Sequence, residues 1–295
     1  MENRPVATII IVTRNREKIL HKMLEEIRKQ KEYDLMEIIV GNDGGKIDAE
    51  KLKKTFPEIK FFDFPEHKGL VKVRNDLFKI AGSGFVFFLD DDAWPEEKDA
   101  VTKALRMFEK YPEAGILNFA IRLSGGKTIP DDISSKTPYD VAVYFGGANA
   151  IRKKFFNNSD IYDEHYFRQG EERDLAIKCL DKGFRILQIN EIAIYHDETD
   201  ILTRDHQLIH RYAFRNELFF YLKYFPAIPC FIFVIKCLIS HFIYCLTKAF
   251  FKAYFLGLAD FIRDSGKFLR RREPVKPATI KKYVALRYFG ENSKP

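Results

Sequence analysis

Cysteine and tryptophan are scarce in this sequence, with four cysteines and one tryptophan among 295 residues. The cysteine spacing matches no metal-ligand pattern, and the chain is too long for a small disulfide scaffold. We therefore expect reduced cysteines that lie in the core or face lipid, in a cytosolic chain. No basic segment followed by a short apolar run begins the sequence, so we also expect no secretion signal. The cysteines are Cys179, Cys230, Cys237 and Cys245.

A glycine-rich loop is also missing where the first apolar run ends, since residues 13–16 read Thr-Arg-Asn-Arg. This absence argues against an NAD-dependent oxidoreductase, which binds the cofactor diphosphate through a G-x-G-x-x-G turn. It argues equally against a sugar nucleotidyltransferase, which needs a glycine-rich loop with a lysine or arginine at this place. The composition is globular, with 46% hydrophobic and 31% charged residues, and the length suits one large domain or a catalytic domain with an appendage.

The charge of the chain is concentrated in a basic C-terminal tail. Residues 248–295 contain twelve basic and four acidic residues, so this tail accounts for the net charge of +7. Such a tail indicates a polyanionic partner, either nucleic acid or an anionic membrane surface. Because the tail follows an apolar stretch, we favour the membrane surface and expect no nucleic acid.

The first 120 residues alternate between β-branched runs and stretches with helical apolar spacing. This alternation predicts an α/β fold with a mostly parallel wound sheet, whose ligands bind at the carboxyl ends of the strands. We expect a catalytic domain over 1–204, with a donor-binding half (1–121) and an acceptor half (122–204), and a helical extension over 205–295. The predicted strands cover 8–13, 37–42, 59–63, 85–90, 115–121 and 185–189, and the predicted helices cover 17–31, 48–55, 70–81, 96–111, 168–182 and 204–224.

Three consecutive aspartates, Asp90 to Asp92, follow a fully apolar run. Their charges repel one another, and a divalent cation such as Mg²⁺ or Mn²⁺, bound together with substrate phosphates, would neutralise them. The alternative is an acidic helix N-terminus, because aspartates cap helices and two glutamates follow. From this segment alone both interpretations stay open.

Two further residues have both a ligand-binding and a structural interpretation. Asp43 follows a predicted strand and precedes two glycines, so it either accepts hydrogen bonds from a ribose or a base, or forms an ordinary turn. Arg74 lies on the first turns of a predicted helix, where it either pairs with a diphosphate or belongs to a solvated basic face.

Taken in order, these segments resemble the signatures of the family-2 inverting glycosyltransferases with the GT-A fold. The resemblance covers residues 6–225, including a Gly-Gly turn followed by an expected helix start over 146–152. The segment 211–226 is similar to the C-terminal part of the rhamnosyltransferase-like branch, whose members assemble cell-surface polysaccharides. The motifs that carry the resemblance are residues 8–16, 42–44, 69–75, 89–92, 146–152 and 162–186.

The resemblance implies a role for each residue of a site. Asp43 would hold the nucleotide base, Asp90 the ribose side and Asp92 the metal. Glu172 aligns with the general base, where the family usually has aspartate, and Glu171 is the alternative base. The remaining donor-site residues are Thr13, Arg14, Arg74 and Asp91. A predicted strand over 192–195 ends at His196, which binds either the metal or a structural hydrogen-bond partner.

The resemblance also implies a reaction. Glu172 would deprotonate an acceptor hydroxyl that displaces the diphosphate of a UDP- or dTDP-linked sugar in one inverting step, with Mg²⁺ or Mn²⁺ as cofactor. The expected acceptor is a glycan or a lipid-linked molecule. A catalytically inactive scaffold of the same fold stays possible, because position 172 departs from the family pattern.

The apolar stretch over 226–260 contains Lys236 as the only charged residue between Lys223 and Lys248. Its length would allow a membrane span of about 20 residues, but its polar residues share one arc of a helix, which indicates an amphipathic helix. With the basic residues that follow, it predicts a monotopic enzyme on the cytoplasmic face of the cell membrane. The alternative is a helix whose apolar face packs on the catalytic domain. The arc comprises Lys236, Ser240, His241, Tyr244, Thr247, Lys248 and Lys252, and the basic residues are Arg270, Arg271, Arg272, Lys276, Lys281 and Lys282.

Overall fold

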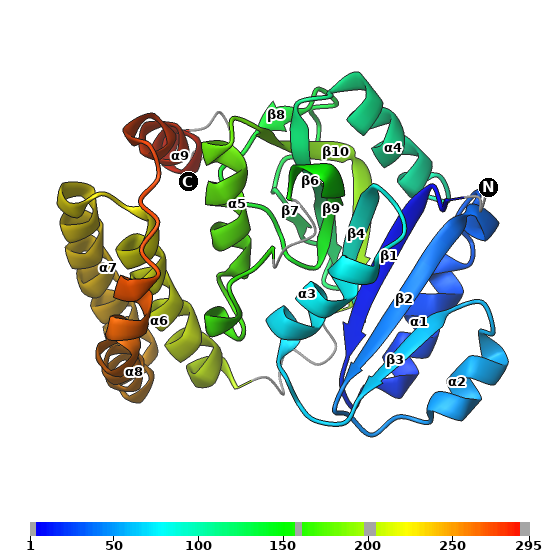
Figure 1. Cartoon of the computed structure of the whole chain (residues 1–295), viewed down its shortest axis with the longest axis horizontal. Helices are drawn as coiled ribbons and strands as arrows, with labels where there is room; N and C mark the ends of the chain where they lie inside the picture. The colour runs from blue at the N-terminus through cyan, green and yellow to red at the C-terminus, as the bar shows by residue number, and fades with distance from the viewer. Residues whose placement is uncertain (1–3, 157–160, 198–204, 290–295) are drawn as a thin grey trace.

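The computed structural model describes residues 4–156, 161–197 and 205–289 (Figure 1). In this part of the chain, ten strands form one mixed sheet, and helices cover both of its faces. The donor half is wound as predicted, with four parallel strands each followed by a helix or a turn. Its elements are β1 (Ala7–Thr13), α1 (Glu17–Ile27), β2 (Met36–Asp43), α2 (Ala49–Thr55), β3 (Lys60–Phe64), α3 (Leu70–Ile80), β4 (Phe85–Asp90) and α4 (Ala100–Lys110).

The central strands are apolar along their whole length because both of their faces are buried. In β1, Ile9 and Ile11 belong to the core beneath α1 and α4, whereas Ile10 belongs to the core on the opposite face. A parallel strand covered by helices on both sides reads as such a continuous apolar run. The polar residues that follow β1, β2 and β4 therefore gather at one edge of the sheet.

The second half of the sheet differs from the prediction at residues 146–152. Residues 146–152 were expected to begin a helix, but Ala148–Arg152 form strand β9, which lies antiparallel between β4 and β6 (Ala114–Leu123). The predicted strands 185–189 and 192–195 are one strand, β10 (Arg185–His196), with an irregularity between Ile189 and Ala193. The short strands β5 (Ala93–Pro95) and β8 (Tyr139–Asp140) pair with β10, and β7 (Thr128–Ile129) pairs with β6.

The aspartate triplet does not cap a helix. Strand β5 follows it directly and pairs antiparallel with β10, and α4 begins only at Ala100. The helix predicted over 96–111 therefore starts four residues later than expected, and the helix-capping interpretation of Asp90 to Asp92 is wrong. The three carboxylates instead lie at the edge of the sheet where β1, β4 and β10 meet.

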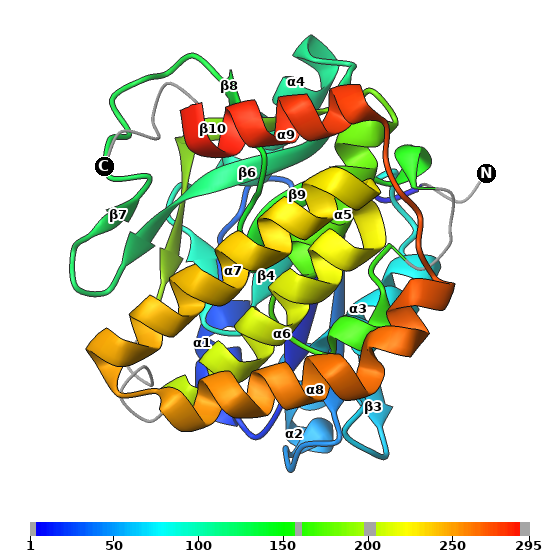
Figure 2. The same cartoon turned by 90° about the vertical axis from the view of Figure 1, so that its left-hand side faces the viewer.

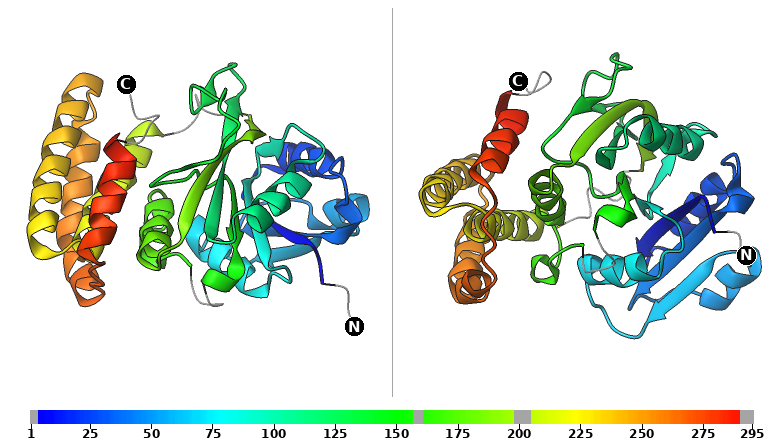
Figure 3. Two further views of the ribbon diagram at one scale, coloured as in Figure 1. Left: turned by 90° about the horizontal axis from the view of Figure 1, so that it is seen from above. Right: turned by 45° about the horizontal axis from the view of Figure 1, so that its top comes forward.

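The C-terminal helices form a separate layer beside the sheet, with α5 (Glu171–Asp181) between them (Figure 3). Helix α6 (His206–Tyr224) packs against both α7 (Ala227–Lys248) and α8 (Phe251–Arg270), as Figure 2 shows. Helix α9 (Pro277–Phe289) returns to pack on α5. Arg204, the expected first residue of the α6 helix, and the end of the predicted 1–204 domain lie outside the described residues, and the domain division stays a prediction.

The amphipathic helix predicted over the apolar stretch is wrong in its extent. It is two helices, because Ala249 takes a left-handed conformation (φ 55°) that ends α7, so Lys252 belongs to α8. The alternative, in which the apolar face packs on the catalytic domain, is wrong as well: Cys237, His241 and Cys245 face inward, and most of the large apolar side chains face outward. All four cysteines are buried free thiols, so the lipid-facing alternative is wrong for them.

Part of the basic tail binds the chain itself. Arg272 donates hydrogen bonds to the carbonyl oxygens of Leu222 and Phe225, and Lys276 donates to the carbonyl oxygen of Asp181. These two cations therefore hold the segment before α9 against α5 and α6. Lys276 is nonetheless exposed, as are Arg270 and Arg271, and contact of the basic tail with lipid stays a prediction.

Candidate active site

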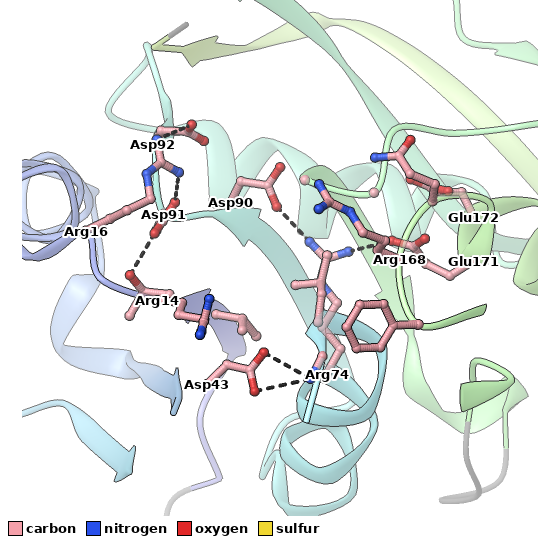
Figure 4. Close-up of a pocket in the computed structure, with 18 of the residues that line it drawn as sticks. Arg14, Arg16, Asp43, Arg74, Asp90, Asp91, Asp92, Arg168, Glu171 and Glu172 are labelled. Atoms are coloured by element: carbon pink, nitrogen blue, oxygen red, sulfur yellow. Dashed lines mark hydrogen bonds and ion pairs between the residues drawn. The ribbon is translucent and has the colours of Figure 1, made fainter. Parts of the chain in front are cut away.

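A cavity of about 460 Å³ opens at the carboxyl ends of β1, β2 and β4, between α3 and the start of α5 (Figure 4). All ten residues predicted for the site line this cavity, although they come from six separate elements. The structure thus brings them together, and the chemical role of each stays a prediction. They are Thr13, Arg14, Asp43, Arg74, Asp90, Asp91, Asp92, Glu171, Glu172 and His196.

Asp90, Asp92 and His196 form a group that could hold a metal ion. One ligand atom of each residue lies within 4.8 Å of the others. Two carboxylates and an imidazole suit Mn²⁺ or Mg²⁺ bound together with phosphate oxygens. The backbone also makes room for this group, because a Cβ atom at Gly147 would lie 2.1 Å from Oδ2 of Asp90. The residues present therefore fit a divalent cation.

The charges next to Asp92 prepare it for such a role. Burial alone would raise its pKa, but hydrogen bonds and charge from His196 and Arg16 lower the pKa of Asp92 to about 2. Nε2 of His196 lies 3.3 Å from one carboxylate oxygen, and Nη2 of Arg16 lies 2.7 Å from the other. Asp91 differs, because burial raises its pKa to about 7 despite Arg16 and the hydroxyl of Thr13. Of Asp91 and Asp92, Asp92 is therefore the one that stays ionised at physiological pH.

Arg74 connects the aspartates to the opposite wall of the cavity. Its side chain is buried, with Nη2 2.8 Å from Oδ1 of Asp90 and Nη1 3.5 Å from Oε1 of Glu171. Glu171 lies deeper than Glu172, and its Oε2 has no hydrogen-bond partner among the described residues. Glu172 lies against Gly146, where a Cβ atom would approach its Oε1 to 2.7 Å.

Asp43 organises the loop that precedes α3. Its carboxylate accepts hydrogen bonds from Nδ1 of His67 (2.8 Å) and from the backbone N–H groups of Lys68 (2.6 Å) and Gly69 (3.1 Å). Gly69 has φ 90°, a left-handed conformation that glycine adopts without strain. The Asp43 carboxylate therefore holds a loop distant in sequence and does not form the ordinary turn of the structural interpretation, and contact with a nucleotide base stays a prediction.

The sequence model described as "Glycosyl transferase family 2" matches residues 8–166, more than half of the chain. The chain belongs to glycosyl transferase family 2. Two curated relatives of this glycosyltransferase support the same family assignment, since both are named as glycosyltransferases. EpsH of Bacillus subtilis, named as a glycosyltransferase, is 31% identical over 135 residues, 44% of the chain and 38% of EpsH. The GalNAc(5)-diNAcBac-PP-undecaprenol beta-1,3-glucosyltransferase of Campylobacter jejuni is 26% identical over 209 residues, 63% of the chain and 65% of the relative.

Solved structures show the same fold at low identity. S. aureus TarS 1–349 in complex with UDP-GlcNAc has a TM-score of 0.65 and 18% identity, covering 95% of the glycosyltransferase and 83% of TarS 1–349. The mannosyltransferase PcManGT of Pyrobaculum calidifontis, in complex with GDP-Man and Mn²⁺, has a TM-score of 0.59 and 13% identity, covering 98% and 88% of the two chains. The predicted GT-A fold of the glycosyltransferase is thereby confirmed.

Two arginines that line the cavity, Arg16 and Arg168, were not predicted from the sequence. Arg16 pairs with both Asp91 and Asp92, and Arg168 lines the cavity beside Glu171. The need of the aspartate triplet for a counter-charge is a signal that could have pointed to Arg16, which lies in the same loop as Arg14. Arg168 lies three residues before the start of α5, and nothing in its sequence context indicates that it lines the cavity.

The described residues contain a second group with metal-ligating side chains, formed by Glu217, Cys237 and His241. Here the carboxylate of Glu217 is already neutralised by Nη1 of Arg173 at 2.8 Å and by Nη2 of Arg287 at 3.2 Å. A dication would add to an excess of positive charge. Asp90, Asp92 and His196 are therefore the better fit for a divalent cation.

Proposed function

We propose that this chain transfers a sugar, with inversion, from a nucleoside-diphosphate sugar to a hydroxyl group of a membrane-proximal or lipid-linked glycan. One observation carries this proposal: a group fit for a divalent cation and a carboxylate fit for a general base line the same cavity. A metal-binding scaffold without activity needs no such carboxylate in the same cavity.

Asp90, Asp92 and His196 would hold a divalent cation, which would supply positive charge that stabilises the leaving diphosphate. Arg74 fixes Asp90 relative to α5 through its contacts with Asp90 and Glu171. Arg16 balances the charge of Asp91 and holds Asp92 at the edge of the cavity. These contacts orient the donor site before substrate arrives, which reduces the reorganisation that the reaction requires.

Glu172 is the proposed general base. Its carboxylate takes the proton of the acceptor hydroxyl as the hydroxyl oxygen bonds to the anomeric carbon, and the bond from that carbon to the diphosphate breaks on the opposite face. One displacement inverts the anomeric configuration and needs no second nucleophile. Nuclear magnetic resonance of the product tests this step, because a retained configuration contradicts it.

The named relatives support the substrate class. TarS is solved with UDP-GlcNAc and PcManGT with GDP-Man and Mn²⁺, and the Campylobacter relative is named for an undecaprenol-linked substrate. We therefore rank UDP-linked donors first and keep dTDP-linked donors as the second choice. A lipid-linked glycan is the acceptor class that we propose.

Thermal denaturation tests the donor assignment. We expect UDP or dTDP, at 100 times its Kd and with Mn²⁺ present, to raise the Tm by about 5 °C, because ligands stabilise the folded state by mass action. The same nucleotide with chelator should shift the Tm far less. If no nucleoside diphosphate raises the Tm in the presence of Mn²⁺, the proposed function is contradicted.

We also propose that the outer faces of α7 and α8 lie on an anionic membrane surface, the cytoplasmic leaflet. Nine large apolar side chains of α7 and five of α8 are exposed, against four in the rest of the described chain. They include Ile228 (76% exposed), Phe231 (69%) and Ile262 (65%). So large an apolar surface marks a protein or membrane contact, and the exposed Lys236, Lys248 and Lys252 next to it favour anionic lipid.

A position on the surface suits α7 better than a position across the membrane. Among the described residues, α7 is one helix with the length and apolar composition to span a bilayer, and 17% of its most apolar window is buried. Its other face, however, is fastened to α6, where Nε2 of His241 lies 3.3 Å from Oε2 of Glu217. Helix α6 in turn reaches the cavity, since the ring of Tyr212 packs on that of Phe167. This arrangement supports an acceptor side of the cavity that lies close to the proposed lipid surface.

Vesicle flotation with full-length protein tests this surface. We expect the double variant Ile239→Glu/Ile243→Glu to bind anionic vesicles at least about tenfold more weakly, because each buried isoleucine contributes about 1.5–3 kcal/mol. High salt should weaken the wild type as well. Leu35→Glu is the matched control, since Leu35 is as exposed as these isoleucines but lies far from α7 in the chain. Equal flotation of wild type and double variant would contradict the proposed membrane face.

A further inference from the structure

The loop that leads into α5, the helix that contains Glu171 and Glu172, has an unusual backbone. Residues 167, 169 and 170 all have positive φ angles: Phe167 60°, Gln169 65° and Gly170 90°. Phe167 and Gln169 are not glycines, so side chains disfavour this conformation and neighbouring contacts must maintain it. A loop of this kind directly before Glu171 and Glu172 needs an external support.

Two adjacent residues of α6 supply that support through the carbonyl groups of the loop. Nη2 of Arg215 donates to the carbonyl oxygen of His165 at 2.6 Å. Nδ2 of Asn216 lies 3.0, 2.7 and 2.6 Å from the carbonyl oxygens of Tyr166, Arg168 and Gln169 respectively.

The orientation of the Asn216 amide is itself fixed. Nε of Arg215 donates to Oδ1 of Asn216 at 3.0 Å, so Nδ2 is the atom that faces the loop. Asn216 is completely buried, and the guanidinium of Arg215 lies between the rings of Tyr212 and Phe219. Water therefore cannot replace the amide as a donor without a rearrangement of α6.

The contact with Gln169 reaches the base through one peptide group. The carbonyl of Gln169 and the N–H of Gly170 belong to the same planar unit, and this N–H donates to Oε2 of Glu172 at 3.1 Å. In a trans peptide the C=O and N–H bonds point in opposite directions within one plane. A donor that fixes the carbonyl therefore also fixes the direction of the N–H that holds the carboxylate.

We propose that Asn216 is a positioning residue that orients the Glu172 carboxylate through the peptide group between Gln169 and Gly170. The proposal rests on the proposed role of Glu172 as the base. Asn216 touches neither the cavity nor the reacting atoms, so it acts only through the loop. The alternative is that Asn216 satisfies buried carbonyl groups and has no specific effect on Glu172.

Kinetics of Asn216→Ala test the proposal. We expect kcat for transfer to fall about 10- to 100-fold, the effect of misplacing a catalytic group by a fraction of an ångström to one ångström, with the Kd for UDP in Mn²⁺ changed less than about threefold. Asn216→Ser keeps a hydroxyl donor of shorter reach and guards against a variant that does not fold. For it we expect a smaller fall in kcat.

A double-mutant cycle separates positioning from general destabilisation. If Asn216 acts through Glu172, Asn216→Ala should lower transfer less than about twofold further in the Glu172→Gln background, because residues that act as a unit are not additive. Full additivity, or a Kd for UDP that weakens in parallel with kcat, would overturn the positioning role. Wild-type transfer by Glu172→Gln alone would instead overturn the proposed base, so the two failures are distinct.

Gln30→Ala is the matched structural control. Gln30 is a buried amide that donates to the carbonyl oxygen of Glu97 at 2.8 Å, between α1 and α4 and away from the cavity. We expect this variant to lower the Tm as Asn216→Ala does and to leave kcat unchanged. Loss of kcat in Gln30→Ala to the same extent would mean that lost stability explains both variants.

Discussion

Asp92→Asn is expected to abolish Mn²⁺ binding and to lower turnover of the sugar donor by at least about 10²-fold. Asp92 is almost fully buried, and His196 and Arg16 keep its pKa at about 2 even though burial alone would raise it. The asparagine amide has the same size but no charge, so the repulsion between the donor diphosphate and Asp90 is no longer compensated by a tightly held cation. Isothermal titration with Mn²⁺, with and without UDP, measures the binding, and UDP release measures the turnover.

The control for this variant is Asp99→Asn. Asp99 forms an ion pair with Lys103 on the surface of α4 at 3.0 Å and takes no part in the cavity. Its removal should leave both Mn²⁺ affinity and turnover at wild-type values, since exposed ion pairs contribute little. Wild-type turnover by Asp92→Asn in the presence of chelator would end the metal-dependent interpretation.

The candidate site was predictable from sequence where chain position determines spatial position. Asp43 and Asp90 end parallel strands, and the carboxyl ends of neighbouring parallel strands always meet at one edge of the sheet. Glu172 lies in the first turn of α5, which begins after Gly170, and the family resemblance supplied the order of the motifs that assigned it to the same site. For these residues, local pattern and topology agree.

The features that could not be predicted depend on contacts between distant parts of the chain. Residues 148–152 contain two alanines and no clear alternation, and they become β9 only because the sheet has a place between β4 and β6. The pairing of Arg16 with Asp92 and of Asn216 with residues 166–169 joins segments that are far apart in sequence. The break at Ala249 has neither glycine nor proline to announce it.

Glu171 and Glu172 differ in burial and in hydrogen bonding, and these differences indicate which of them is the base. Burial and the neighbouring Glu172 carboxylate raise the pKa of Glu171, which is almost fully buried. Two close carboxylates do not both ionise readily, and the deeper one retains the proton. Burial also raises the pKa of Glu172, but this side chain is less buried than Glu171 and accepts the N–H of Gly170, a bond that favours its charged form. We therefore expect Glu171 to be neutral and Glu172 to be the base.

Glu172→Gln is accordingly expected to lower sugar transfer by about 10² to 10⁴-fold, the usual contribution of a positioned general base. The glutamine can still accept the Gly170 N–H, so the start of α5 should remain folded and the Kd for UDP in Mn²⁺ should change only a few-fold. Glu171→Gln keeps a neutral group beside Arg74, and we expect a much smaller fall in transfer. Steady-state transfer assays on both variants decide between them. An inactive Glu171→Gln together with an active Glu172→Gln would move the base by one residue, to the carboxylate that Arg74 contacts.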